Sequence, residues 1–323
     1  MKKSEKAVVI IAVSCIAVSC IVGGLIAILA SAVFGIAVGL IAILASLVWI
    51  GFNFTKLNTT TFETTSYEIQ ENFQNIDIRD FVCNIRLVPA EDGVCRVVCA
   101  ETDRITNTVE VIEDTLTITR TDRRRWYERI QIWWGNDLSV TVYLPEKTYQ
   151  SLYLKTVSGH IEVPDTFSFS DVELLSTSGD ISFAAGSSKG LLIQSTSGHI
   201  RAQNAAGGPV EAVTVSGDIV LSDITADTLH VKTTSGDIRA SSVIVSGQAD
   251  LNGISGHIQL KDSDAGSFAI HTVSGDVTGT ILFPKNFATA TTSGDIRIPA
   301  SDTAAGGCNI TTISGNIQIE VVS

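Results

Sequence analysis

Hydrophobic and polar residues alternate with a period of two through the second half of the chain, around a recurring corner. The phrase Ser-Gly-Asp-Ile, or a close variant, occurs nine times between Ser158 and Ser314, at steps of 19 to 21 residues. Apolar residues usually stand six and four positions before each Ser, as Leu152 and Leu154 do before Ser158. They stand again three and five positions after it. This alternation on both sides of a corner predicts two short β-strands in each repeat.

The regular recurrence predicts an all-β fold whose main part is a parallel β-solenoid of about nine 19–20-residue coils, over residues 151–323. A single coil cannot bury its apolar side chains, but stacked coils bury a continuous row of them. A sharp corner between strands needs a positive φ, which glycine adopts freely. The structural corners are therefore expected at Gly159, Gly179, Gly198, Gly217, Gly236, Gly256, Gly275, Gly294 and Gly315.

The residue after each corner glycine has two interpretations. In chain order these residues are His160, Asp180, His199, Asp218, Asp237, His257, Asp276, Asp295 and Asn316. Stacked carboxylates could form a cation ladder, because their oxygens are Ca²⁺ ligands. Alternatively, Asp, Asn and His cap backbone donors at turns. We favour capping, because histidines interrupt the acidic run and one carboxylate per coil supplies few ligands. A Ser-His-Asp catalytic site is disfavoured for a similar reason, since the Ser-Gly-His phrase belongs to a repeated structural unit.

The last repeat contains Ile317, Ile319 and Val321 and no polar cap follows it. An open solenoid end is an exposed sheet edge, which can pair with another chain. Self-association through the last coil is therefore one expectation, and the alternative is that a bulky pair of residues shields this end.

Residues 76–150 are expected to form a small β region that caps the solenoid, after a connector at 51–75. A hairpin in which Val88 faces Val94 would place Cys83 opposite Cys99, at a separation slightly wide for a disulfide. Cys83 and Cys99 are therefore a candidate disulfide. The alternative is two buried thiols, which are common in protein cores.

One segment of this region combines arginines with aromatic residues. It contains Arg123, Arg124, Arg125, Trp126, Tyr127, Trp133 and Trp134. Aromatic anchors flanked by arginine are typical of interface hot spots, so this segment is a candidate binding loop. It could instead contact anionic lipid headgroups. A third interpretation is structural, with the tryptophans covering the first coil and the arginines pairing with acidic residues.

Residues 1–50 are expected to be a membrane anchor. Lys2, Lys3 and Lys6 precede an uncharged run at 7–50, about twice the roughly 20 residues that span a bilayer. The anchor could be one long helix, with the rest of the chain outside the cell, or two short helices that return it to the cytoplasm. We favour the first topology, which places the protein in the cell membrane with an extracellular repeat domain.

Charge narrows the range of partners. The chain carries 22 basic and 34 acidic residues, a net charge of −12. An acidic body repels nucleic acid, so no nucleic-acid partner is expected. No Cys-x-x-Cys pair is present, and we expect neither a metal nor a cofactor.

The chain resembles a bacterial family of putative adhesins of unknown function, LiaG-like β-solenoids with Ser-Gly-Asp-Ile repeats. The resemblance is carried by Thr-x-Ser-Gly-Asp-Ile in the repeats and by the strand ending at Val142-Tyr143-Leu144-Pro145. Cys95 to Cys99 and Arg125-Trp126-Tyr127 add to it, and it covers the chain from about residue 56 onward. It implies a β-solenoid behind one membrane anchor. Some members of the family are linked to cell-envelope stress, so the resemblance also implies such a link. It implies no catalytic residues.

We therefore expect a non-enzymatic, membrane-anchored cell-surface β-solenoid that serves adhesion, binding or envelope scaffolding, with a protein or cell-wall partner. One alternative is a cell-envelope stress accessory protein that regulates a membrane partner. A carbohydrate-active enzyme is a further alternative, because parallel β-helices host several. Such an enzyme needs paired carboxylates in a groove, whereas the repeats spread theirs one to a coil.

Overall fold

The computed structural model describes residues 63–79, 82–124 and 139–322, which belong to one compact unit between Phe62 and Ser323. The described residues form β-strands and their connections, which confirms the all-β prediction. Among them, no helix is long and apolar enough to cross a membrane. The anchor expected at 1–50 lies outside the described residues.

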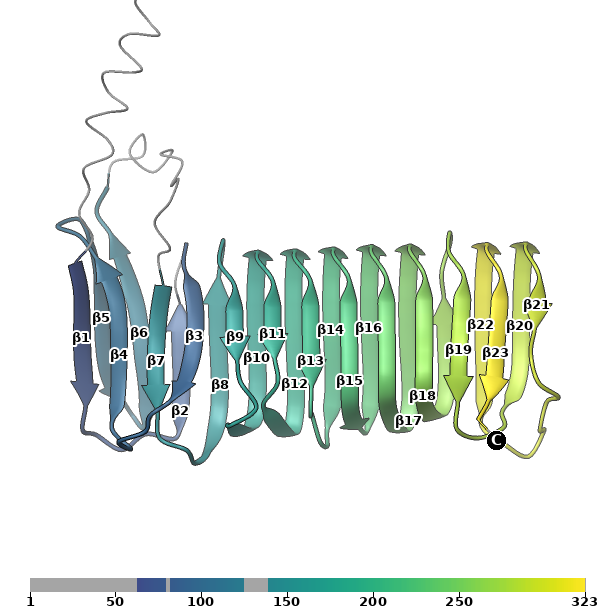
Figure 1. The fold of residues 1–323 in the computed structure, drawn as a ribbon, viewed down its shortest axis with the longest axis horizontal. Coiled ribbons are helices and arrows are strands. Elements are labelled where there is room, and N and C mark those ends of the chain that lie inside the picture. The colour runs from purple at the N-terminus through teal and green to yellow at the C-terminus, as the bar shows by residue number, and fades with distance from the viewer. Residues whose placement is uncertain (1–62, 80–81, 125–138, 323) are drawn as a thin grey trace, which may run out of the picture. The chain divides into compact units, whose positions relative to one another are not determined.

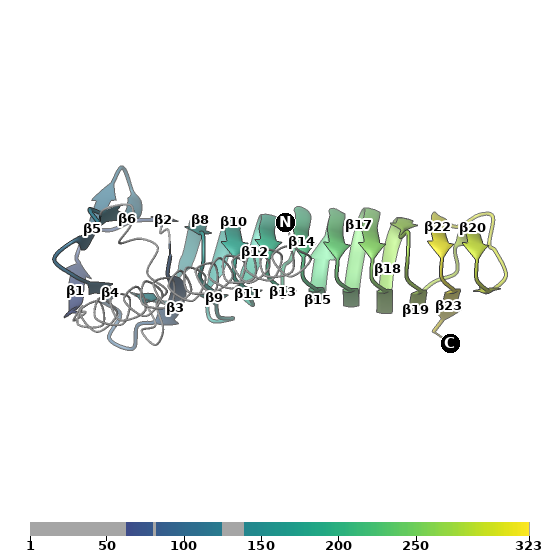
Figure 2. The same cartoon turned by 90° about the horizontal axis from the view of Figure 1, so that it is seen from above.

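The strands form two rows, seen side by side from above in Figure 2. Going along the stack in Figure 1, the first row contains β6 (Thr115–Asp122), β2 (Asn75–Arg79), β8 (Thr148–Thr156), β10 (Ser168–Ser178), β12 (Gly186–Ser197), β14 (Pro209–Ser216), β16 (Thr228–Ser235), the later parts of β17 (Ile238–Ser255) and β18 (Ile258–His271), then β22 (Gly307–Ser314) and β20 (Asn286–Ser293). Neighbours in this row are parallel.

The second row follows the corners of the same coils. It contains β7 (Ser139–Leu144), β3 (Asn84–Pro89), β9 (Ile161–Val163), β11 (Ile181–Phe183), β13 (Ile200–Gln203), β15 (Ile219–Ala226), the first parts of β17 and β18, then β19 (Val277–Ile281), β23 (Ile317–Val321) and β21 (Ile296–Arg297). The predicted parallel β-solenoid is therefore confirmed.

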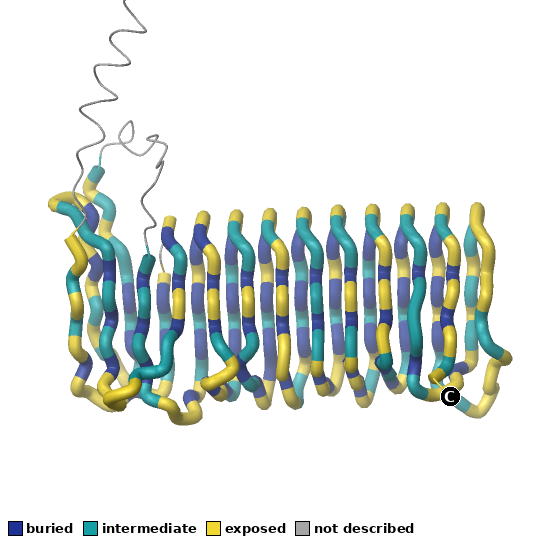
Figure 3. The backbone as a smooth tube through the Cα atoms, viewed as in Figure 1, coloured by how far each residue is buried: buried dark blue, intermediate teal, exposed yellow. Residues whose placement is uncertain are grey.

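The core is built by stacking the same repeat position from coil to coil. Leu152 pairs with Val172, which pairs with Leu191, and beyond the corner Ile161 pairs with Ile181. These side chains are buried, and Figure 3 shows the resulting alternation of buried and exposed positions along each strand. Each fully buried Leu or Ile contributes about 1.5–3 kcal/mol of hydrophobic stabilisation. The period-two pattern of the sequence thus becomes one continuous apolar interior.

The corner glycines are required mainly by how closely the coils approach one another. A Cβ at Gly236 would overlap the carbonyl oxygen of Gly217, and a Cβ at Gly217 would overlap that of Gly198. The same overlap with a neighbouring backbone carbonyl occurs at all nine corners. The expected positive φ is found at five of them, from 143° to 152°, namely Gly217, Gly236, Gly256, Gly275 and Gly294. Clearance for stacking, rather than φ alone, is therefore the common requirement.

A tenth corner without the Ser-Gly phrase precedes the nine. Val82-Cys83-Asn84-Ile85 lies in register with Ser158-Gly159-His160-Ile161, because Ile76 pairs with Leu152 and Ile85 with Ile161. Cys83 takes the place of the glycine. The coil on its other side, β6–β7, has no Ser-Gly phrase in its sequence. The repeat therefore begins earlier than the boundary expected at residue 150, which falls inside β8.

An antiparallel cap closes the stack beside the β6–β7 coil. It consists of β5 (Ile105–Ile112), paired with β6, and β4 (Cys95–Glu101), paired with β7 and with β1 (Glu63–Ile69). A polar cluster holds the three strands together, since the Glu101 carboxylate accepts from the Tyr67 hydroxyl at 3.0 Å and from the Asn107 backbone N–H at 2.7 Å. The end of the stack beside β6 and β7 is thus closed by antiparallel strand pairing.

The hairpin expected between residues 88 and 94 is wrong. Strand β7 lies between β3 and β4, so Val140 pairs with Ile85 on one side and with Cys99 on the other. Two strand spacings, about 10 Å, then separate the strands of the two cysteines, beyond the reach of a disulfide. Cys83 and Cys99 form no disulfide and are buried thiols.

The last coil of the sequence is not the last coil of the stack, which corrects the expected open end. Strand β22 pairs with β18 on one side and β20 on the other, and β23 lies between β19 and β21. The coil around Gly315 is therefore inserted between those around Gly275 and Gly294, as Figure 1 shows. The other end is arranged alike, since β2–β3 lies inside β6–β7. The open edge belongs to β20 and β21.

Substitution of one corner glycine tests this stacking. We expect Gly236→Ala to lower the free energy of unfolding by about 2–3 kcal/mol, because the added methyl group meets the backbone of the neighbouring coil. Urea unfolding of residues 62–323 measures the change. Gly307→Ala is the matched control, since a Cβ there meets no atom within 4 Å. Equal stability of the two variants would contradict the proposed role of close approach.

Candidate functional site

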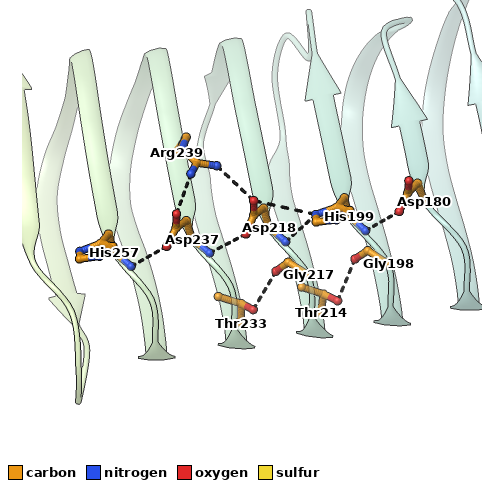
Figure 4. Close-up of polar contacts among 10 residues, drawn as sticks. All are labelled: Asp180, Gly198, His199, Thr214, Gly217, Asp218, Thr233, Asp237, Arg239 and His257. Carbon is orange, nitrogen blue, oxygen red and sulfur yellow. Dashed lines mark hydrogen bonds and ion pairs between the residues drawn. The ribbon is translucent and has the colours of Figure 1, made fainter.

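The residue after each corner glycine forms a ladder of hydrogen bonds along the stack. Its side chain accepts the backbone N–H of the equivalent residue in the next coil, at 2.7–3.1 Å, from Asn84 through His160 to Asp295. Figure 4 shows part of this ladder, from Asp180 to His257. Asp and Asn use Oδ1, while His160, His199 and His257 use Nδ1 and must carry no proton there. These bonds match the capping interpretation.

A second set of bonds uses the threonine that stands two residues before the corner serine in six of the nine repeats. Thr214 Oγ1 donates to the carbonyl oxygen of Gly198 at 3.2 Å, and Thr233 Oγ1 to that of Gly217 at 3.1 Å (Figure 4). Thr156, Thr272, Thr291 and Thr312 make the equivalent bond in their coils. Ser176 and Ser195 take this position in two further repeats, and their hydroxyls are buried without a hydrogen-bond partner among the described residues. The six threonine hydroxyls donate to backbone carbonyls, which leaves them unsuited to act as nucleophiles.

Asp218 shows the electrostatics of the ladder. The N–H of Asp237 donates to Asp218 Oδ1 at 2.9 Å, and Arg239 bridges Oδ2 of Asp218 and Oδ2 of Asp237 at 3.2 and 2.6 Å. The backbone hydrogen bond from Asp237 lowers the pKa of Asp218 most, and Arg239 lowers it further. The carboxylate is therefore held in its charged form by the neighbouring coil.

Among the described residues, no group of three or more His, Cys, Asp or Glu side chains is placed to hold a metal ion. Burial raises the pKa of the Cys95 and Cys308 thiols to about 12, so both remain protonated at neutral pH. The repeated polar residues and the buried cysteines thus have structural roles.

An exposed row of β-branched side chains runs along the stack beside the corners. The residue just before each corner serine is Val, Ile or Thr in all nine repeats. Val157, Val215, Ile254 and Ile313 are 38–50% exposed, although they are large and hydrophobic. Thr177, Thr196, Thr234, Val273 and Thr292 complete this β-branched row, in which neighbouring coils are about 4.8 Å apart. The row is visible in the sequence only when the repeats are aligned position by position on their corner serines.

Most of the candidate binding loop lies outside the described residues, namely Arg125, Trp126, Tyr127, Trp133 and Trp134. Its first two residues are described. The N–H of Arg123 donates to the Arg104 carbonyl at 2.8 Å. Arg124 is largely buried and forms a two-pronged ion pair with Asp122, with Nε–Oδ1 and Nη2–Oδ2 distances of 3.0 and 2.7 Å. For Arg124, therefore, pairing with an acidic residue of the β region matches the structural interpretation.

The strand order shows where the candidate binding loop leaves the stack. It connects β6 to β7, and so takes the place of a Ser-Gly corner in that coil. Thr65, Cys99 and Val140 lie in register on β1, β4 and β7. The start of β1 therefore lies level with the start of β7, with β4 between them.

Stacked corners, a continuous interior and a capped end define the class of this protein as a capped parallel β-solenoid. The chain belongs to the family described as Toastrack DUF4097, whose model matches residues 73–280 and 209–323.

The chain is also similar to solved structures, at low sequence identity. A putative adhesin from Bacteroides fragilis is 18% identical, with 81% of this chain and 97% of that chain covered and a TM-score of 0.42. A putative lipid binding protein from Parabacteroides distasonis is 17% identical, with coverage of 81% and 98% and a TM-score of 0.43. A comparison with curated proteins yields no match.

Asp218 offers a test of the ladder through pH. Because its pKa is lowered in the folded state, the carboxylate stabilises the protein above the unfolded-state pKa of 3.8, and this contribution is lost as pH falls through the folded-state pKa. We expect Asp218→Leu to cost about 1 kcal/mol at pH 7, the usual value of one hydrogen bond. The difference in unfolding free energy between the wild type and Asp218→Leu should shrink in strong acid. Urea unfolding at both pH values measures it.

Asp218→Asn is the control for this test, since Asn occupies the ladder at positions 84 and 316 and keeps the acceptor oxygen. It should retain most of the stability at pH 7. A Leu variant as stable as the wild type at pH 7 would contradict the role of the ladder.

Proposed function

We propose that the protein is a non-enzymatic, membrane-anchored β-solenoid at the bacterial cell surface, where it binds an extended partner or serves as an envelope scaffold. One observation carries the proposal. Most of the repeated polar groups form hydrogen bonds between coils, while the β-branched row is exposed at seven of its nine positions and half-buried at Thr234 and Val273. A row of this kind offers repeated weak contacts to a partner that is itself long and regular.

The stack suits such a partner because it is rigid. Each coil is joined to the next by backbone pairing in both rows and by the side-chain ladder. The β-branched side chains lose little rotamer freedom when they are covered, since Val, Ile and Thr are already restricted. Binding would therefore order few groups, which favours a protein or a cell-wall polymer as the partner.

The same hydrogen bonds argue against the alternative of a carbohydrate-active enzyme. A pair of catalytic carboxylates must differ in environment and face a common groove. Here Asp180, Asp218, Asp237 and Asp276 are spread one to a coil, and each accepts one backbone N–H from the next coil. These carboxylates serve the stack and not a substrate.

Binding can be tested with residues 62–323, which form a compact unit with its own core. We expect this fragment to co-sediment with purified cell walls. The double variant Val215→Asp, Ile254→Asp should weaken binding at least about tenfold, because it places charges in the β-branched row. The matched control Ser182→Asp, Gln259→Asp adds the same charge at exposed positions of the other strand row.

Equal binding by the two double variants would contradict the role of the β-branched row. Retention by a membrane protein instead of the wall would favour the envelope-stress alternative, and release of sugar would favour an enzyme.

The side of the membrane can be tested by thiol labelling. The native cysteines of the solenoid are buried, so an exposed reporter is required. We expect Thr196→Cys in the full chain to react with a membrane-impermeant maleimide in intact cells, because residue 196 is exposed. The wild-type chain gives the background. Labelling of the variant only after lysis would contradict an extracellular solenoid.

A further inference from the structure

The two ends of the solenoid differ in how their edges are protected. The capped end finishes in β1 and β5, which carry Glu63, Glu68 and Glu110. Strand β20, at the other end, has no charged residue and no proline from Asn286 to Ser293. Charges and prolines are the usual protection of an edge strand against pairing with another chain. Strand β20 lacks this protection, and β21 carries only the charge of Arg297.

The apolar interior is also open at this end. Ile296 occupies the position that is buried in the other coils, yet it is 42% exposed. Phe287 and Ile298 pack only partly against the core. Among the described strands, β20 pairs with β22 alone and β21 with β23 alone, so no further coil covers these side chains.

One half of the edge is already occupied. The N–H of Asn286 points towards β22 and donates to the carbonyl oxygen of Gly306 at 3.0 Å. Because successive N–H groups along a strand point to opposite sides, the N–H of Phe287 points away from the stack. That N–H donates to Ser301 Oγ at 3.2 Å. Ser301 belongs to the segment between β21 and β22, which bulges beyond the lower part of the last coil in Figure 1. The open half is the one near the corner.

Two unmatched charges lie in this open half. Asp295 ends the ladder, and its carboxylate accepts no hydrogen bond within the part of the chain that the structure describes. Arg297 forms no ion pair within the same part of the chain. By contrast Arg239, which has the same spacing from Asp237, bridges two carboxylates. The last coil thus presents an acid and a base on either side of an exposed isoleucine.

We propose that this end is the interface of an end-to-end dimer with a second copy of this chain. A two-fold axis at Ile296 sets β21 antiparallel to its copy. Ile296 then packs on Ile296 of the second copy, and Asp295 lies opposite Arg297 in both directions. The same axis brings the corner-proximal part of β20 against its copy and leaves the Ser301 segment outside. One coil cross-section is a small interface, so the association is in the micromolar range.

Sedimentation equilibrium of residues 62–323, from about 1 to about 100 μM, tests the dimer. The wild type is expected to form dimers. Arg297→Glu places like charges opposite each other twice and should raise the Kd at least about tenfold. The double variant Asp295→Lys, Arg297→Glu reverses both charges and should restore association. Ile254→Lys is the matched control, because Ile254 is 46% exposed but lies on the side of the stack.

Thermal melting of each variant checks that the fold is intact. A wild type that stays monomeric throughout would overturn the proposal. So would a double variant no more associated than Arg297→Glu, or assembly into open-ended polymers, which indicates contact between unlike ends.

Discussion

The structure depends on the close approach of neighbouring coils at the corner. The backbone of one glycine packs directly against the carbonyl group of the next, so a side chain at that position cannot be accommodated. At that separation the residue after the glycine can reach the N–H of the next coil, and the preceding threonine can reach the glycine carbonyl. The distance between coils thus determines the residue types at three positions of the repeat, which are the glycine, the residue after it and the preceding threonine. It also explains why Asp, Asn and His alternate freely, since each offers a short acceptor.

Period-two alternation and the repeat length were sufficient to predict two strands per coil, the parallel stack and the structural role of the corner. They were not sufficient to predict the order of the coils at either end. Every coil carries the same apolar positions and the same corner, so the sequence alone allows the coil around Gly294 to follow that around Gly275 directly, with the coil around Gly315 at the end. The choice depends on long-range pairing that no local pattern encodes.

The predicted hairpin between residues 88 and 94 failed for a related reason. Two apolar strands joined by a Gly-containing turn favour direct pairing, but both strands here pair with β7, more than 40 residues further on. The tenth corner was missed because it has Cys83 in place of glycine. The pattern around it was nevertheless visible, since Ile76, Ile78, Ile85 and Leu87 hold the same offsets as the apolar residues of the other repeats.

The insertion of coils at both ends affects how the chain can lengthen or shorten. Residues 307–321 are covered on both sides, so loss of the last few residues would open a gap within the stack and expose two coils at once. Deletion of residues from the C-terminus therefore does not simply remove the outermost coil of the solenoid. Whole repeats can be gained or lost only between β8 and β18, where sequence order and spatial order agree. The ends would then keep their identity while the length between them varies, and any partner bound at an end would be held at a distance determined by the number of middle coils.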